Sequence, residues 1–291
     1  MLAEVVDLLV CPVCGAGFAL AGPVLRCATG HSFDVAKQGY VNLMPGGARP
    51  GTADTAEMVA DRAAFLGAGH YEPLASAVAG LATGAAAPGE KPVVLDAGAG
   101  TGYYLAAVLS RLGAGPGAGA GAGARPVGLA LDISARALRR AARAAPGIGA
   151  VGWDTWQPFP VRSASASLIL NVFAPRNGPE FHRVLAPGGT LLVVTPGPGH
   201  LAELAAPAGL ITVDEHKDER LAATLGPYFT ATDRQDLPVP LRLTHADAAH
   251  LVAMGPSAWH IDVPETRARL APQPEPLPVT AAFTLTTYRP R

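Results

Sequence analysis

From residue 92 onward, short apolar runs alternate with amphipathic segments, and this alternation constrains the fold more than any other feature of the sequence. The runs are continuous and rich in Val, Leu and Ile, as are strands buried on both faces of a parallel sheet. Strands are predicted at 92–98, 126–134, 148–154, 166–175, 190–197 and 279–288, and helices at 101–113, 134–146, 179–189 and 245–254. This order predicts an α/β fold whose helices cover both faces of a parallel sheet.

Two regions precede the predicted sheet. Residues 1–45 hold all three cysteines and short β-like runs, which indicates a small module of its own. Residues 46–90 have a helical pattern that Asp54 could cap, and a Gly-His-Tyr-Glu-Pro stretch at 69–73 divides it into two helices. We therefore expect three parts, with the main domain at 91–291.

Composition and charge exclude several classes of protein. Hydrophobic residues make up 49% of the chain, enough for a sizeable core and too many for a disordered chain. No stretch of about 18 residues is apolar and free of Gly, Pro and charge, so we expect no membrane span. The net charge of -1 argues against a protein that coats nucleic acid. A Gly-Ala stretch at 113–124 predicts a flexible surface loop.

The N-terminal segment and the cysteines bear on the compartment. The first apolar run has two acidic residues and no Lys or Arg before it, unlike a secretory signal. Three cysteines are an odd number for disulfides, and all lie within the first 27 residues. Reduced thiols in a cytoplasmic protein fit this usage better than disulfides do.

The cysteines form a metal-binding pattern, Cys11-x2-Cys14-x12-Cys27-x3-His31. Two thiolates two residues apart ligate one ion from a tight turn, and a second pair about a dozen residues later completes a tetrahedron. Three thiolates and one imidazole suit Zn²⁺, and four protein ligands leave no open position, so we expect a structural site. The spacing leaves no recognition helix between the pairs, so DNA is not the expected partner.

A glycine-rich loop follows the strand at 92–98. It reads Gly98-Ala-Gly100-Thr101-Gly102, and Asp96 precedes its first glycine by two positions. Glycines permit a tight turn and close approach of a ligand. The dinucleotide fingerprint would need a third glycine where Tyr103 stands. A carboxylate beside the loop suits a ligand with an ammonium group and no pyrophosphate, so S-adenosylmethionine is favoured over NAD.

Polar residues follow the next strands at the same predicted edge. Asp132 ends the second strand, where a carboxylate can accept both ribose hydroxyls of the cofactor. Asp154 follows the third strand, near the expected adenine. Asn171 ends the fourth, and its amide with the following Phe173-Ala174-Pro175 could orient a flat base. Each could equally be a strand-end turn residue.

Together these features resemble one known family, the bacterial 23S rRNA guanine-N1 methyltransferases, especially the branch of tylosin-resistance enzymes of antibiotic producers. The resemblance is carried by CPVC…C…GHSFDVAKQGYVNLM, DTAEMVADRAAFLGAGHYEPL, VLDAGAGTGYY, LNVFAPRN, GGTLLVVTPGPGHLAEL and AMGPSAWH, spread from residue 11 to residue 260. It implies a Rossmann-like, S-adenosylmethionine-dependent methyltransferase sheet with an N-terminal zinc-ribbon-like module for RNA recognition.

The resemblance also implies an activity and partners. The expected reaction is N1 methylation of one guanine in a hairpin of 23S rRNA domain II, as naked RNA or in an assembling large subunit, with lowered sensitivity to macrolides. A homodimer is a further expectation, and no membrane partner is expected. The zinc ligands would be Cys11, Cys14, Cys27 and His31, and the cofactor contacts Tyr71, Gly98 to Gly102, Asp132 and His200.

Several points stay open at the level of sequence. A base must take the guanine N1 proton, and Asp154 and His200 are candidates, whereas Asn171 could only position the guanine. Six arginines within 111–150 could contact RNA phosphates, or could form a solvated helix face. The alternative functions are a small-molecule methyltransferase of a biosynthetic pathway with a structural zinc, and a non-catalytic zinc-containing adaptor.

Overall fold

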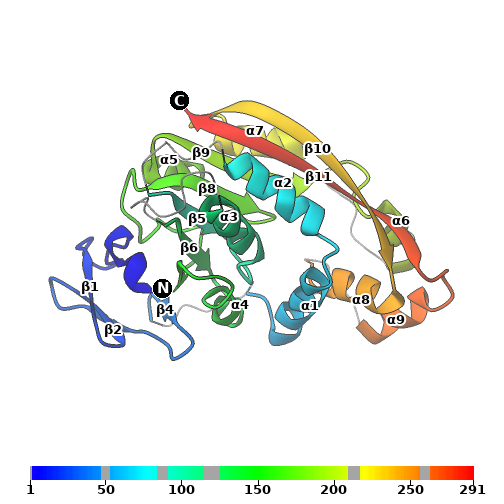
Figure 1. Cartoon of the computed structure of the whole chain (residues 1–291), viewed down its shortest axis with the longest axis horizontal. Helices are drawn as coiled ribbons and strands as arrows, with labels where there is room; N and C mark the ends of the chain where they lie inside the picture. Colours follow the sequence, from blue (N-terminus) through cyan, green and yellow to red (C-terminus); the bar gives the residue numbers. More distant parts are fainter. Residues whose placement is uncertain (1, 47–52, 84–90, 115–124, 209–216, 256–262) are drawn as a thin grey trace.

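The computed structural model describes residues 2–46, 53–83, 91–114, 125–208, 217–255 and 263–291 (Figure 1). Its large sheet has the strand order β10-β11-β9-β8-β5-β6-β7-β4. These strands are β4 (Tyr40–Asn42), β5 (Val93–Ala97), β6 (Val127–Asp132), β7 (Ile148–Gly152), β8 (Ala166–Val172), β9 (Leu185–Pro196), β10 (Phe229–Leu243) and β11 (Leu277–Pro290). The α/β architecture predicted from the sequence is confirmed.

The chain order within this sheet creates a crevice. From β5 the chain adds β6 and β7 on one side, and β8 then returns to the other side of β5. All of these neighbours are parallel. Open α/β sheets bind ligands at the carboxyl ends of the strands where the order reverses in this way. The ends of β5, β6 and β8 are therefore the expected ligand-binding edge of the sheet.

The sheet is mixed, in contrast to the all-parallel expectation. β11 runs antiparallel to β9, and β10 runs antiparallel to β11 at the edge. β10 was not predicted from the sequence, because Pro238 and Pro240 interrupt it and most of its side chains are exposed. Proline cannot donate to a ladder and is tolerated on edge strands, which is where this one lies.

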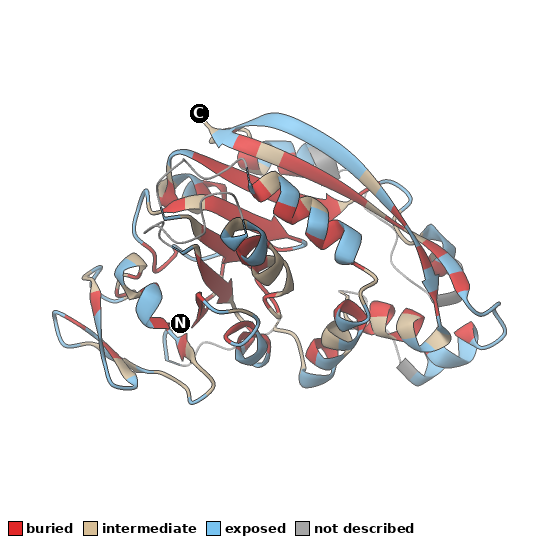
Figure 2. Ribbon diagram, in the orientation of Figure 1, coloured by how far each residue is buried: buried red, intermediate tan, exposed pale blue. Residues whose placement is uncertain are grey.

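Helices cover both faces of the sheet (Figure 2). The helices are α1 (Ala56–Gly67), α2 (Glu72–Ala82), α3 (Tyr103–Gly113), α4 (Ala135–Ala141), α5 (Gly178–Val184), α6 (Ala202–Ala208), α7 (Lys217–Leu225), α8 (His245–Ala253) and α9 (Val263–Leu270). One core lies between the sheet and α1 to α4 with α8, and the other packs α5, α7 and the N-terminal segment on the opposite face.

The helical boundaries follow local signals with two corrections. The break predicted at 69–73 separates α1 from α2, but the side chain of Thr55, not Asp54, caps α1 by accepting from the amide of Met58. The predicted helix at 179–189 ends at Val184 because Pro187 cannot continue it. Among the described helices, none is long and apolar enough to cross a bilayer.

The N-terminal region is joined to the main sheet. Its 3-10 turns (Leu2–Glu4 and Val6–Leu8) and its three-stranded sheet, β1 (Phe18–Ala21), β2 (Val24–Cys27) and β3 (Ser32–Asp34), precede β4. β4 pairs with β7 and extends the large sheet. The side chain of Val5 fills the place of a side chain at Gly149, since a Cβ there would lie 2.1 Å from its Cγ2. The module is thus docked on the main domain.

Candidate active site and metal centre

The glycine loop between β5 and α3 needs glycine at three positions. Gly98, Gly100 and Gly102 have φ values of +85°, +53° and +78°, which side chains disfavour. A Cβ on Gly98 would also lie 2.4 Å from the Cβ of Ala174, in the loop that follows β8. The turn therefore brings the ends of β5 and β8 into direct contact at the crevice.

Asp132 lies at the end of β6 and supports this loop. Its Oδ2 accepts from the amide of Gly100 (2.8 Å), and its Oδ1 accepts from the amide of Ser134 (2.7 Å). Burial raises the pKa of the carboxyl, and the two backbone hydrogen bonds oppose that change. A carboxylate has about four lone-pair sites, so both oxygens can accept further hydrogen bonds from ribose hydroxyls. Ser134 caps α4, as predicted.

Asp96 at the end of β5 is a buried acid. The residue is only 2% exposed. Burial, with a smaller contribution from the charge of Asp132, raises its pKa to about 8. A carboxyl group in this state favours a bound cation, because a cation would restore the ionised form. The ammonium group of S-adenosylmethionine meets this requirement.

Arg62 of α1 lies over the loop, a position that sequence reasoning missed. A Cβ on Gly100 would lie 3.4 Å from its Nη1, so the guanidinium group covers the glycine turn. Nη1 pairs with Asp54, and Nη2 donates to the backbone oxygen of Met254 (2.8 Å). The backbone oxygen of Asp54 accepts from Ser134 Oγ (3.2 Å). The start of α1 is thus fastened across the loop by contacts far apart in sequence.

Tyr71 and His200 meet at one aromatic cluster. Tyr71 precedes α2, is 2% exposed, and packs edge-on against Phe65 (centroids 4.9 Å apart) and Phe283 (5.0 Å). Burial raises the pKa of its phenol. The ring of His200, in the turn after β9, lies 5.1 Å from Phe283. The structure therefore brings together two residues 129 positions apart, through a phenylalanine of β11.

Asn171 is fully buried beneath the loop that follows β8. Its Nδ2 donates to the backbone oxygens of Pro175 (2.8 Å) and Ala97 (3.3 Å), which ties the loop to the end of β5. Its Oδ1 is buried and has no hydrogen-bond partner among the described residues. The sequence predicted that this amide, with Phe173 to Pro175, could orient a flat base. In the structure Nδ2 is held by these two backbone oxygens, and Phe173 is 42% exposed.

Asp154 lies apart from Asn171. Its Oδ1 accepts from the amide of Trp156 (3.0 Å) in the turn after β7. The ends of β7 and β8 are separated by β6 and β5, so the two residues lie about 14 Å apart at the strand spacing of a sheet. The structure does not bring these two candidates into one catalytic group.

The four predicted metal ligands do converge. Cys11, Cys14, Cys27 and His31 place their ligand atoms within 4.8 Å of one another. The Sγ atoms of Cys14 and Cys27 are 3.7 Å apart, and His31 Nδ1 lies 3.7 Å from Cys11 Sγ and 3.4 Å from Cys27 Sγ. Tetrahedral Zn²⁺ with ordinary bond lengths needs edges of about 3.5 to 3.8 Å. Donor set and spacing therefore fit Zn²⁺.

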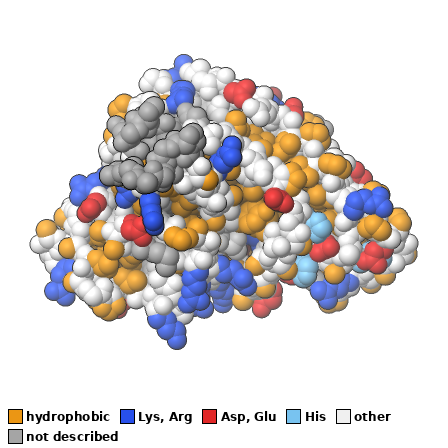
Figure 3. Space-filling model, in the orientation of Figure 1, with side chains coloured by type: hydrophobic (Ala, Val, Ile, Leu, Met, Phe, Trp, Pro, Cys, Tyr) orange, Lys and Arg blue, Asp and Glu red, His pale blue; other side chains and the backbone are white. Residues whose placement is uncertain are grey.

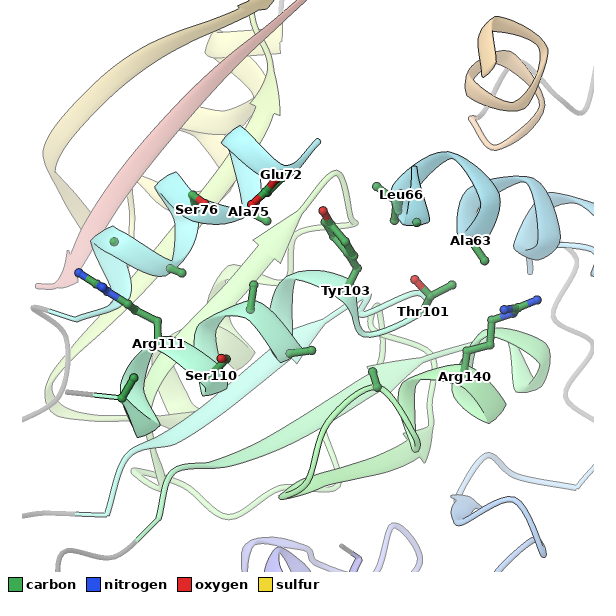
Figure 4. A pocket seen from close by; sticks show the side chains of 17 residues that line it. Ala63, Leu66, Glu72, Ala75, Ser76, Thr101, Tyr103, Ser110, Arg111 and Arg140 are labelled. Atoms are coloured by element: carbon green, nitrogen blue, oxygen red, sulfur yellow. The ribbon is translucent and has the colours of Figure 1, made fainter. Parts of the chain in front are cut away.

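A groove of about 960 Å³ lies outside the crevice, between α1, α2, α3 and α4 (Figure 4). Alanine and glycine make up most of its lining, with Arg111 and Arg140 at opposite sides of the view. Thr101 of the glycine loop and Tyr103, the first residue of α3, line part of it, but the site carboxylates and Asn171 do not. The groove is therefore not the cofactor crevice, although it borders it.

The arginines of α4 form a basic surface. The exposed side chains are those of three arginines of α4 and one in the turn that follows it: Arg136, Arg139, Arg140 and Arg143. Figure 3 shows Lys and Arg gathered at the lower rim of the molecule, where Figure 1 places α4 between the N-terminal module and α1. This surface starts beside the glycine loop, because Ser134 caps the helix at that edge. The Gly-Ala stretch predicted as a loop falls mostly outside the described residues.

Known proteins resemble the chain along its whole length. Residues 9–49 match the zinc-ribbon family described as RlmA, N-terminal. The 23S rRNA (guanine(748)-N(1))-methyltransferase of Streptomyces fradiae is 47% identical over 100% of this chain and 99% of its own. A relative from Micromonospora griseorubida, provisionally named a 23S rRNA (guanine-N(1)-)-methyltransferase, is 49% identical over 96% of both chains. A solved structure provisionally named a methyltransferase, from Bacillus halodurans, covers 73% of this chain and 97% of its own at 14% identity, with a TM-score of 0.48.

Proposed function

We propose, because this chain belongs to the 23S rRNA (guanine-N1)-methyltransferase family, that it transfers a methyl group from S-adenosylmethionine to N1 of a guanine in 23S rRNA. The observation that carries this proposal is identity of 47% over the full length of an enzyme named for that reaction. A buried acid, a glycine loop and a second acid at the crevice support it. Both alternatives from the sequence are less favoured, since near-complete relatives are named for rRNA methylation.

Different residues of the crevice bind different parts of the cofactor. The glycine loop, Gly98 to Gly102 with Thr101, lets the backbone approach the cofactor closely. Asp132 accepts hydrogen bonds from the ribose hydroxyls, and Asp96 faces the ammonium group. Tyr71 and His200 close the aromatic side of the pocket. When bound, S-adenosylmethionine supplies an electrophilic methyl group on a sulfonium. The protein aligns the guanine N1 with that carbon and excludes water.

Asn171 acts as a positioning residue in this proposal. Its amide fixes the loop after β8, so it sets where the guanine stands without touching it. His200 suits the role of proton acceptor better than Asp154. Its Nδ1 lies 2.7 Å from the backbone oxygen of Ala282, an acceptor, so Nδ1 carries the hydrogen and Nε2 is the basic nitrogen of the neutral ring. Asp154 stays with the adenine end of the crevice.

The RNA around the target guanine is held outside the crevice. The basic surface of α4 fits RNA phosphates, and the zinc module (1–45) fits recognition of the RNA shape, while the helical segment (46–90) covers the cofactor loop. We further propose a hairpin of 23S rRNA domain II as the target, free or in an assembling large subunit, in the cytoplasm. A homodimer and lowered macrolide sensitivity complete the proposal.

Three experiments test the proposed function. Nucleoside mass spectrometry of 23S rRNA from cells with and without the gene should show N1-methylguanosine only in its presence. In vitro, labelled S-adenosylmethionine should methylate 23S rRNA and not a total metabolite extract. Transfer to the extract alone would support a small-molecule enzyme. Absence of heat in a calorimetric titration with S-adenosylmethionine would support an adaptor.

A further inference from the structure

Phe173 combines exposure with an unfavourable backbone. Its side chain is 42% exposed at the carboxyl end of β8. Its φ is +53°, and only two other non-glycine residues in the described part of the chain have a positive φ, Ala164 and Leu201. A bulky residue in this region costs about 1 to 2 kcal/mol. Such an arrangement persists where the surroundings fix it, and it concentrates at functional sites.

The surroundings of Phe173 fix its ring while leaving much of it open. Its centroid lies 5.7 Å from that of Phe283 and 6.4 Å from that of Tyr104. Phe283 in turn contacts Tyr71 and His200. The backbone amide of Phe173 donates to the backbone oxygen of Val194 (3.1 Å), which fastens the loop to β9. Phe173 is therefore the exposed end of the aromatic cluster that borders the cofactor pocket.

The position of Phe173 along the chain places it beside the methyl donor. The next residue, Ala174, is the one whose Cβ would meet a Cβ on Gly98 of the glycine loop. Adjacent Cα atoms are about 3.8 Å apart, so the Cα of Phe173 is one residue away from the point where the chain contacts the cofactor loop. A flat group lying on this ring would stand at the crevice where β5 and β8 end. The buried amide of Asn171 holds that geometry from below.

We infer that Phe173 is the stacking platform for the target guanine, holding the unstacked base beside the methyl donor. This inference rests on the proposed function and deepens it. An aromatic side chain that is rigid and half open suits a purine, because every base has a π face and a base extruded from its helix loses its own stacking partners. β8 is buried on both faces as far as Val172, and the positive φ of Phe173 marks the point where the chain leaves the strand and the next ring becomes exposed.

The test uses the full-length protein with 23S rRNA transcribed in vitro. Phe173→Leu keeps apolar volume but loses the flat face, and it should lower kcat/KM for RNA by about 5- to 100-fold. Phe173→Tyr keeps the ring and should stay within about threefold of wild type. The dissociation constant for S-adenosylmethionine, measured by calorimetry, should not change in either. The matched control is Trp156→Leu, which removes another exposed aromatic side chain (64% exposed) and should leave kcat/KM unchanged.

A second pair of variants separates stacking from folding. Phe173→Gly and Phe173→Ala both remove the ring, and glycine should give the higher Tm because it adopts the positive φ without strain. Both should lower kcat/KM for RNA at least as much as Phe173→Leu does, while still binding S-adenosylmethionine. Full kcat/KM in Phe173→Leu, or a parallel loss of cofactor affinity, would overturn the inference alone. If wild-type protein binds S-adenosylmethionine but methylates no rRNA, the proposed function fails and the inference falls with it.

Discussion

Replacement of Asp96 by Asn tests whether the carboxyl group of Asp96 is protonated in the cofactor-free protein. The side chain is 2% exposed, and its pKa is raised from 3.8 to about 8 by burial and by Asp132. Between these two values the native carboxyl keeps its proton while the unfolded one loses it. Stability is therefore fully present below the unfolded pKa and is lost as pH rises towards the folded pKa.

The expected size follows from the linkage. Each pH unit in that window costs about 1.4 kcal/mol, so from about pH 5 to about pH 7 the acid removes about 3 kcal/mol of unfolding free energy. Asparagine has the same shape as aspartate and no titrating proton. Between about pH 5 and about pH 7 the free energy of unfolding of Asp96→Asn should therefore fall by about 3 kcal/mol less than that of the wild type. Urea unfolding of both proteins at the two pH values measures the difference. Asp34→Asn, at an exposed acid of β3, is the matched control.

Cofactor binding gives the same test an independent readout. An ammonium group beside Asp96 binds the ionised carboxylate, so wild-type affinity for S-adenosylmethionine should rise up to about tenfold per pH unit from about pH 6 to about pH 8. Affinity in Asp96→Asn should be weaker and nearly flat with pH. The raised pKa of Asp96 would be refuted if the free energy of unfolding changed equally with pH in wild type and Asp96→Asn, and if their affinities for S-adenosylmethionine also changed equally with pH.

Three further perturbations have defined outcomes. Gly98→Ala forces a Cβ to within 2.4 Å of Ala174 at a φ of +85°, so it should lower the free energy of unfolding by at least about 2 kcal/mol and weaken cofactor binding; an unchanged urea midpoint and Kd would contradict this. Asn171→Ala should cut kcat far more than cofactor affinity, and equal losses in calorimetry and turnover would remove its positioning role. Chelation of zinc, or Cys27→Ser, should lower Tm of the N-terminal module and weaken RNA binding in a filter assay, whereas an unaltered melting curve after chelation would exclude a structural metal.

Features encoded by neighbouring residues were predictable. The ligand atoms at Cys11 and Cys14 share one turn, and those at Cys27 and His31 share another, so spacing alone indicated the metal centre that the structure assembles. The strand at 92–98 and the glycine loop behind it likewise follow from local apolar runs and from the conformations that glycine permits. These elements depend on short-range sterics, which the chain carries in its order of residues.

Contacts between distant segments could not be read in this way. Phe283 sits in an alternating apolar strand, and nothing in that pattern indicates that it joins Tyr71 to His200. β4 directly follows the small N-terminal sheet along the chain, yet it pairs with β7 of the large sheet.

The sequence by itself determined the zinc ligands, the α/β class and the glycine loop, because each needs only residues close along the chain. Tertiary structure decided which side chains face the crevice. Burial of Asn171 beneath its loop, the cover of Arg62 over Gly100 and the outward turn of Phe173 all arise from packing between strands and helices that only folding brings together. The physical reason is that a side chain's direction depends on its partners across the core, and such partners can lie far away along the chain: Arg62 and Met254 are 192 positions apart.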